Sequence, residues 1–215
     1  MEKLAKSKYF SVTIRNLPAG KAERFLTWVC CSFKGFLATA SGKLRIPSLP
    51  PGTLQFVLAN ASPIKELGFH TDFNDNTQLS KVVFHGTSLD RLYPILHQGL
   101  KIMSGTALQA YGAASGAGIY LADEPSTSWI YTNHASTTRA NWSRSAIKSG
   151  RILLGCELTG TSTAARSGIH VITKESSVMV RYIFVVPPET TVLPIANHLT
   201  SSMMSVFNSL RSGAL

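Results

Sequence analysis

Apolar residues in this chain gather into short runs that end at turn-forming residues. The runs are rich in β-branched and aromatic side chains, a composition that favours strands over helices. One of them, KVVFH, stops at a glycine and is typical of a buried strand. The predicted strands cover residues 55–59, 81–85, 151–158, 169–173 and 180–186.

Other segments repeat apolar positions every three or four residues, which is the spacing of one helix face. Strands nevertheless outnumber helices and cluster late in the chain. This order predicts an α+β fold built on antiparallel sheets rather than on alternating βαβ units. The predicted helices cover residues 22–33, 89–98 and 196–210, with a further helix that begins at Pro63 after the capping residue Ser62.

The composition suits a globular protein. A length of 215 residues with 44% hydrophobic and 15% charged residues predicts one domain over residues 1–215, with residues 1–20 as an N-terminal extension. No apolar run approaches the ~20 residues of a membrane span, and no apolar segment follows the charged start as in a secretory signal. Cys30, Cys31 and Cys156 fit neither a disulfide framework nor a zinc site. We therefore expect an intracellular protein, cytoplasmic or nuclear, with no membrane partner and no bound metal.

The formal net charge is +10. A surplus of this size suits a polyanionic or acidic partner, or else a solvated surface that keeps the protein soluble. The basic residues are scattered along the chain and form no dense run. Scattered charges favour the solvated surface, with nucleic acid as the alternative partner.

The residues whose side chains or backbone groups could bind a ligand are concentrated between Phe84 and Tyr131. His85 ends a predicted strand beside Gly86, and a glycine lets a ligand approach the backbone closely enough to exchange hydrogen bonds with it. Ser128 and Tyr131 lie three residues apart, so on a helix they share one face. A serine hydroxyl can bond a carboxamide, and a tyrosine ring can stack on a cationic pyridinium. The segment therefore suits a flat ring that carries an amide.

The same residues also have structural interpretations. A histidine at a strand end is often structural, Tyr120 suits a buried strand aromatic, and Ser126 suits the N-cap of an ordinary helix. The lone Gly116-x-Gly118 pair is not part of a G-x-G-x-x-G pattern that follows a strand, which excludes a Rossmann dinucleotide site.

Three motifs together resemble the catalytic domain of poly(ADP-ribose) polymerases: FHGT at residues 84–87, GIYLAD at 118–123 and S-x-S-x-x-Y at 126–131. The resemblance is most specific over residues 81–131, and over the wider chain it is closest to mono-ADP-ribosyltransferase branches. It implies a fold of two packed, mostly antiparallel β-sheets flanked by helices. It also implies an enzyme that cleaves the nicotinamide–ribose bond of NAD⁺, its co-substrate, and passes ADP-ribose to an acceptor.

The resemblance also assigns the nicotinamide site. The Gly86 backbone and the Ser128 hydroxyl would hold the carboxamide. Tyr131 would stack on the ring, and Tyr120 would pack on its other side. Because nicotinamide leaves as a neutral molecule from a cationic ring, positioning matters more than a strong acid.

The remaining family positions concern the ribose and the acceptor. His85 would bind ribose hydroxyls and orient the donor, and Thr87 stands where the family usually has serine. The third catalytic position lies on the strand over 180–186, where polymer-forming members carry a glutamate. We align Tyr182 with it, while a one-residue slip would place Arg181 there. With an unperturbed pKa of ~10, a tyrosine cannot replace a carboxylate near neutral pH, so the chain is predicted to transfer single ADP-ribose units. The predicted catalytic residues are His85, Tyr120 and Tyr182.

Two other functions remain open. The chain could be a catalytically inactive module that binds NAD⁺ or ADP-ribose, although the presence of both His85 and Tyr120 argues against it. An RNA 2′-phosphotransferase would suit the basic charge, but the sequence shows no paired arginine–histidine cluster that could grip a 2′-phosphate. The predicted acceptor is a protein, which includes the chain itself, with nucleic acid as the alternative.

Overall fold

The structure is a computed structural model in which the chain divides into two units, residues 1–34 and residues 35–215. The residues that the structure describes all belong to the second unit. They cover 36–76, 79–106, 115–132, 147, 149–160, 163–166, 168–191, 193 and 196–212. The predicted helix over 22–33 and the N-terminal extension over 1–20 lie outside the described residues.

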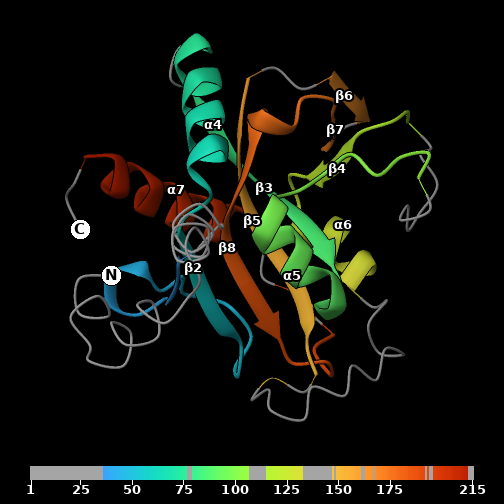
Figure 1. The fold of residues 1–215 in the computed structure, drawn as a ribbon. Helices are drawn as coiled ribbons and strands as arrows, with labels where there is room; N and C mark the ends of the chain where they lie inside the picture. Colours follow the sequence, from blue (N-terminus) through green and yellow to red (C-terminus); the bar gives the residue numbers. More distant parts are fainter. Residues whose placement is uncertain are drawn as a thin grey trace, which may run out of the picture. The chain divides into compact units, whose positions relative to one another are not determined.

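The described residues form one eight-stranded sheet in which every neighbouring pair of strands is antiparallel (Figure 1). The order across the sheet is β1-β2-β8-β5-β3-β4-β7-β6, so strands distant in sequence lie side by side at its centre. The α+β class and the antiparallel pairing predicted from the sequence are confirmed. The strands are β1 (Phe36–Thr39), β2 (Leu54–Asn60), β3 (Ser80–Thr87), β4 (Ile119–Ala122), β5 (Arg151–Thr159), β6 (Thr163–Arg166), β7 (Ile169–Ile172) and β8 (Val178–Val186).

Helices accompany the sheet in the described part of the chain (Figure 1). They are α4 (Pro63–Asp75), α5 (Leu89–Gln98), α6 (Pro125–Trp129) and α7 (Ala196–Ser212), with short 3₁₀ helices η1 (Gly42–Leu44) and η3 (Glu175–Ser177). As predicted, α4 begins at Pro63 and α5 covers residues 89–98; the capping residue after α5, Gly99, has a positive φ of 76°, which favours glycine. Among the described residues, no helix has the length and apolar character needed to cross a membrane.

The two sheets expected from the sequence are joined into one. Strands β3 and β4 pair at a single position, Phe84 with Ala122. By contrast, β3 pairs with β5 along its whole length. The strands β4, β7 and β6 therefore form a smaller part that is attached to the larger part through a short junction.

The register of the three central strands sorts their side chains onto two faces. Residues paired directly across antiparallel strands project to the same face, and successive residues alternate between faces. One row across β3, β5 and β8 consists of Phe84, Gly155 and Tyr182. The next row consists of His85, Leu154 and Ile183. The two rows therefore face opposite sides of the sheet.

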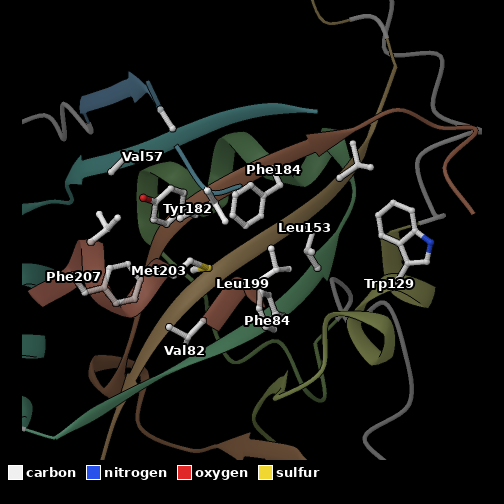
Figure 2. Packing of buried hydrophobic residues seen from close by; sticks show 14 residues of the cluster. Val57, Val82, Phe84, Trp129, Leu153, Tyr182, Phe184, Leu199, Met203 and Phe207 are labelled. Atoms are coloured by element: carbon white, nitrogen blue, oxygen red, sulfur yellow. The ribbon is translucent and has the colours of Figure 1, made fainter. Parts of the chain in front are cut away.

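The face of the first row carries a hydrophobic core with α7 (Figure 2). Helix α7 contributes residues spaced four, seven and eight apart, which lie along one side of a helix. These residues are Leu199, Met203, Val206 and Phe207. Gly155 makes room for the helix, because a Cβ atom there would lie 2.3 Å from the terminal methyl of Met203. The ring of Tyr182 stacks on Phe184, with centroids 5.5 Å apart.

Strand β8 contains a bulge at Arg181. Gly155 pairs with Tyr182, but the next residue of β5, Cys156, pairs with Val180, so Arg181 has no partner on β5. Its guanidinium donates hydrogen bonds to the buried carboxylate of Glu157 (3.0 Å) and to Glu66 of α4 (3.2 Å). The bulge therefore directs a charged side chain out of the strand row and ties β8 to β5 and α4.

Candidate functional site

His85 and Tyr120 are held together by a hydrogen bond between β3 and β4. The His85 Nδ1 atom lies 2.8 Å from the backbone carbonyl oxygen of Tyr120. A carbonyl oxygen only accepts, so Nδ1 carries the proton and donates it, which leaves Nε2 of the neutral ring as an acceptor. Burial is the largest effect on the pKa of His85 and lowers it. The hydrogen bond to the Tyr120 carbonyl raises this pKa, and the positive charge of Arg91 lowers it further. The imidazole is therefore neutral near pH 7 and can accept a hydrogen bond from a hydroxyl.

Tyr120 is anchored through its hydroxyl group. The hydroxyl donates to the Gly116 carbonyl oxygen (2.7 Å) and accepts from the Ser115 backbone N–H (2.9 Å). These bonds fix the ring against the segment that leads into β4. The group that Tyr120 offers to a ligand is therefore its ring, not its hydroxyl.

Gly86 is required by the packing of α6 against β3. A Cβ atom at this position would lie 1.9 Å from the Ser128 carbonyl oxygen and 3.2 Å from the Thr132 methyl group. The backbone amide groups of residues 84 and 86 face the same edge of β3 because they lie two apart. Among the described residues, β4 pairs with β3 at Phe84 alone, so β4 does not pair with the backbone of Gly86 at this edge. Because Gly86 has no side chain, the α6 segment also lies close to its backbone.

Ser128 is buried and donates its hydroxyl proton to the Phe84 carbonyl oxygen at 2.9 Å. Its oxygen keeps lone pairs that can accept a hydrogen bond from an amide N–H. The interpretation of Ser126 as the N-cap of this helix is wrong, because α6 begins at Pro125 with Glu124 at the N-cap. Proline at the first helical position has the φ angle that a helix needs and lacks only an N–H that would be unpaired there.

Tyr131 lies just beyond the end of α6, and the residue is 39% exposed. Thr87, two residues after His85 on β3, is buried and lies on the same face as that histidine. Of the predicted NAD⁺-binding residues, the structure therefore groups His85 with Tyr120, and Gly86 with Ser128 and the turn that follows it. These two groups meet on adjacent residues of β3.

Tyr182 is not brought together with His85. It is fully buried in the core on the α7 face (Figure 2). Its hydroxyl donates to the Leu44 carbonyl oxygen at 2.8 Å. Burial raises the pKa of this hydroxyl far above its usual value. The β8 residue in the row of His85 is instead Ile183. Arg181, the other candidate for the third catalytic position, donates hydrogen bonds to the carboxylates of Glu157 and Glu66.

Arg151 is a residue that sequence reasoning missed. It lies at the start of β5, and its guanidinium contacts the residues that flank the end of α6. A single arginine at the start of a strand gives no local sequence signal, because its partners lie about twenty residues earlier in the chain.

A cavity of about 570 Å³ lies elsewhere, between β3, the end of β4 and α7. It contains none of the predicted site residues. In its lining, Asp123 accepts a hydrogen bond from Lys81 (3.1 Å), and Asp123 also lies 2.9 Å from Nε2 of His170. The residues lining the cavity are Ser80, Lys81, Val82, Asp123, Glu124, Thr200, Ser201 and Met204.

Among the residues that the structure describes, no group of three or more His, Cys, Asp or Glu side chains could hold a metal ion. Cys156 is a buried free thiol. The donor set around His85 consists instead of an imidazole, a hydroxyl and backbone amides, which suit a neutral amide and sugar hydroxyls.

Comparisons with known proteins agree with this chemistry. The profile of the poly(ADP-ribose) polymerase catalytic domain matches residues 53–177, which include the segment from His85 to Tyr131 and stop one residue before β8. The chain is also similar to the mouse and human proteins named "Protein mono-ADP-ribosyltransferase PARP8", with 32% identity over 115 residues. That alignment covers 52% of this chain and only 13% of each relative. This chain belongs to the poly(ADP-ribose) polymerase catalytic domain family.

Proposed function

We propose that this protein is an ADP-ribosyltransferase that uses NAD⁺ and transfers a single ADP-ribose unit to a protein acceptor. The observation that carries the proposal is the hydrogen bond from His85 Nδ1 to the Tyr120 carbonyl, inside the segment that matches the family. It fixes a neutral histidine whose Nε2 accepts from a hydroxyl, the role that a ribose-binding histidine requires.

The nicotinamide ring would be held by the α6 segment and β3. The backbone N–H of Gly86 would donate to the carboxamide oxygen, and the Ser128 oxygen would accept from the carboxamide N–H. Tyr131 would stack on the ring, which is favourable because the pyridinium carries a positive charge. The Tyr120 ring, fixed by its hydroxyl bonds, would limit the other side.

His85 would orient the ribose by accepting a hydrogen bond from one of its hydroxyl groups at Nε2. Bound NAD⁺ supplies an activated glycosyl bond: the C1′–N bond breaks, nicotinamide leaves with the electron pair, and the acceptor oxygen, nitrogen or sulfur bonds to C1′ and loses its proton to solvent. The residues contribute by fixing the donor in a reactive orientation. A neutral His85 avoids placing a positive charge beside the one that develops at the ribose.

The composition of β8 supports the proposal that single units are transferred. The strand carries no carboxylate, so the family's glutamate is missing whichever residue is aligned with it. Chain elongation needs a group that activates a ribose hydroxyl of the attached unit, and neither a buried tyrosine nor an arginine serves as such a base. The printed name of the PARP8 relatives supports the same proposal.

We extend the proposal to partners and location. The acceptor would be a protein, which includes the chain itself, and the net charge of +10 suits an acidic protein surface or nucleic acid as an alternative. An intracellular location, where NAD⁺ is available, fits the proposed reaction. One observation favours a second function, an inactive module that binds NAD⁺ or ADP-ribose: Tyr182 lies on the face opposite His85.

Nicotinamide release from NAD⁺ by the purified protein tests the proposal, together with transfer of labelled ADP-ribose. We expect both activities in the wild type and their loss in His85→Ala. His198→Ala, which changes an exposed histidine on α7, is the matched control and should keep full activity. Binding of NAD⁺ without release would select the inactive module. Long polymers on a gel would refute transfer of single units.

A further inference from the structure

Arg151 forms a clamp around the end of α6. Its Nη2 atom donates to the Trp129 carbonyl oxygen at 2.8 Å, and its Nε atom donates to the Thr132 hydroxyl at 2.7 Å. The Thr132 hydroxyl in turn donates to the same Trp129 carbonyl at 2.7 Å. The guanidinium therefore closes a ring of hydrogen bonds that fixes the last carbonyl of the helix, a group that has no partner within the helix itself.

The clamp also includes a stacking contact. The Arg151 Cζ atom lies 3.5 Å from the centroid of the Trp129 indole, which is buried in the core. Tryptophan is the strongest aromatic partner for a cation, and a planar guanidinium can lie flat on it while its edge donates hydrogen bonds. A lysine could reach one of these partners but could not stack and donate to both at once.

The clamped residues are the neighbours of the proposed nicotinamide-binding residues. Trp129 directly follows Ser128, and Thr132 directly follows Tyr131. The Ser128 carbonyl and the Thr132 methyl are also the atoms closest to the missing Cβ of Gly86. Fixing Trp129 and Thr132 therefore limits the distance between Ser128 and Tyr131, and it holds Ser128 and Thr132 against Gly86.

We propose that Arg151 is a positioning residue that holds Ser128 and Tyr131 at the spacing needed to grip the nicotinamide ring. This inference rests on the proposed function and deepens it. Arg151 itself touches no part of the substrate. It acts on the ring-binding half of the site and leaves the binding of the ADP-ribose half unchanged.

Ligands that separate the two halves of NAD⁺ test this proposal. Titration calorimetry would measure the affinities of nicotinamide and of ADP-ribose, which lacks the ring, for the wild type, Arg151→Lys and Thr132→Val. In Arg151→Lys we expect nicotinamide affinity to fall about tenfold, the size of one lost charge-assisted hydrogen bond, and ADP-ribose affinity to change less than about twofold. Thr132→Val removes one arm of the clamp and should give a smaller, selective loss. Arg45→Lys, at an exposed arginine, is the control and should change neither affinity.

Thermal unfolding of each variant separates positioning from simple stabilisation. An equal loss of both affinities together with a lower melting temperature would overturn the proposal, because it would mean that Arg151 only stabilises the fold. Unchanged nicotinamide affinity in Arg151→Lys would overturn it as well. A wild type that binds neither nicotinamide nor NAD⁺ would refute the proposed function itself, and this inference with it.

Discussion

Replacing Gly86 with alanine places a methyl group in the contact between β3 and α6. The added carbon would lie 1.9 Å from the Ser128 carbonyl oxygen, whereas such a carbon needs about 3.3 Å from a carbonyl oxygen. The obstructing atoms belong to the backbone, so no side-chain rotation relieves the clash. The α6 segment must therefore move away from β3 by more than about 1 Å.

Two magnitudes follow from this displacement. Overpacking of this kind destabilises a protein by about 1–3 kcal/mol, and for a chain of this length each kcal/mol lowers the melting temperature by roughly 2–4 °C. A misplacement of about 1 Å in a group that positions substrate costs roughly 100-fold in rate. We therefore expect Gly86→Ala to remain folded but to lose roughly 100-fold in kcat/KM for nicotinamide release.

The assay is nicotinamide release with thermal unfolding measured in parallel. The matched control is Gly68→Ala in α4, where the new Cβ would be at an ordinary contact distance of 3.4 Å from the Ser176 Cβ. Because alanine favours a helix more than glycine does, the control should gain up to ~1 kcal/mol and keep its activity. A Gly86→Ala variant with normal turnover would show that the contact with Ser128 does not control the site.

Three further predictions test other parts of the structure. Tyr182→Phe should change the rate of nicotinamide release by less than about twofold and lower the free energy of unfolding in urea by about 1 kcal/mol, because it removes only the hydrogen bond to the Leu44 carbonyl. A large loss of turnover in the folded variant would indicate a catalytic role for Tyr182. Because burial lowers the pKa of His85, the folded protein binds the imidazole proton less tightly than the unfolded chain, so stability should begin to fall as pH drops below ~6.5. Turnover should fall at still lower pH, where the folded histidine is protonated, and a loss of activity toward alkaline pH would contradict this. Gly155→Ala should lower the free energy of unfolding by about 1–3 kcal/mol, because the new methyl group clashes with Met203. In a double-mutant cycle, Gly155→Ala should cost no stability when it is made in a chain that already carries Met203→Ala.

The sequence predicted the central part of the site because local rules act there. The predicted strand over 81–85 lies within β3, which continues through Gly86 to Thr87, and the predicted helix over 89–98 has the bounds of α5. The four-residue strands β1, β4 and β6 were not among the predicted strands, because none carries two adjacent β-branched residues as β7 does at Val171 and Ile172. Arg151 was missed because its role depends on contacts across the fold.

The orientation of Tyr182 could not be predicted from the sequence. Without the bulge at Arg181, the pairing of Cys156 with Val180 would continue to Leu154 with Tyr182, which is the row of His85. One extra residue in the strand moves the tyrosine to the opposite face. A bulge depends on the partner strand and on charged contacts such as those of Glu157, so strand alternation alone does not reveal it.

The single pair between Phe84 and Ala122 bears on how the site moves. Strands β3 and β4 meet at this pair and at the adjacent bond from His85 to Tyr120. Lys81 of β3 adds contacts with Asp123 and His170. Local opening there separates the two proposed walls of the site without unfolding β5 or β8. A ligand that contacts both walls binds only the closed form and should slow amide hydrogen exchange in β4 and β7 more than in the central strands. The weakest connection in the sheet would then be the place where substrate binding adds most rigidity.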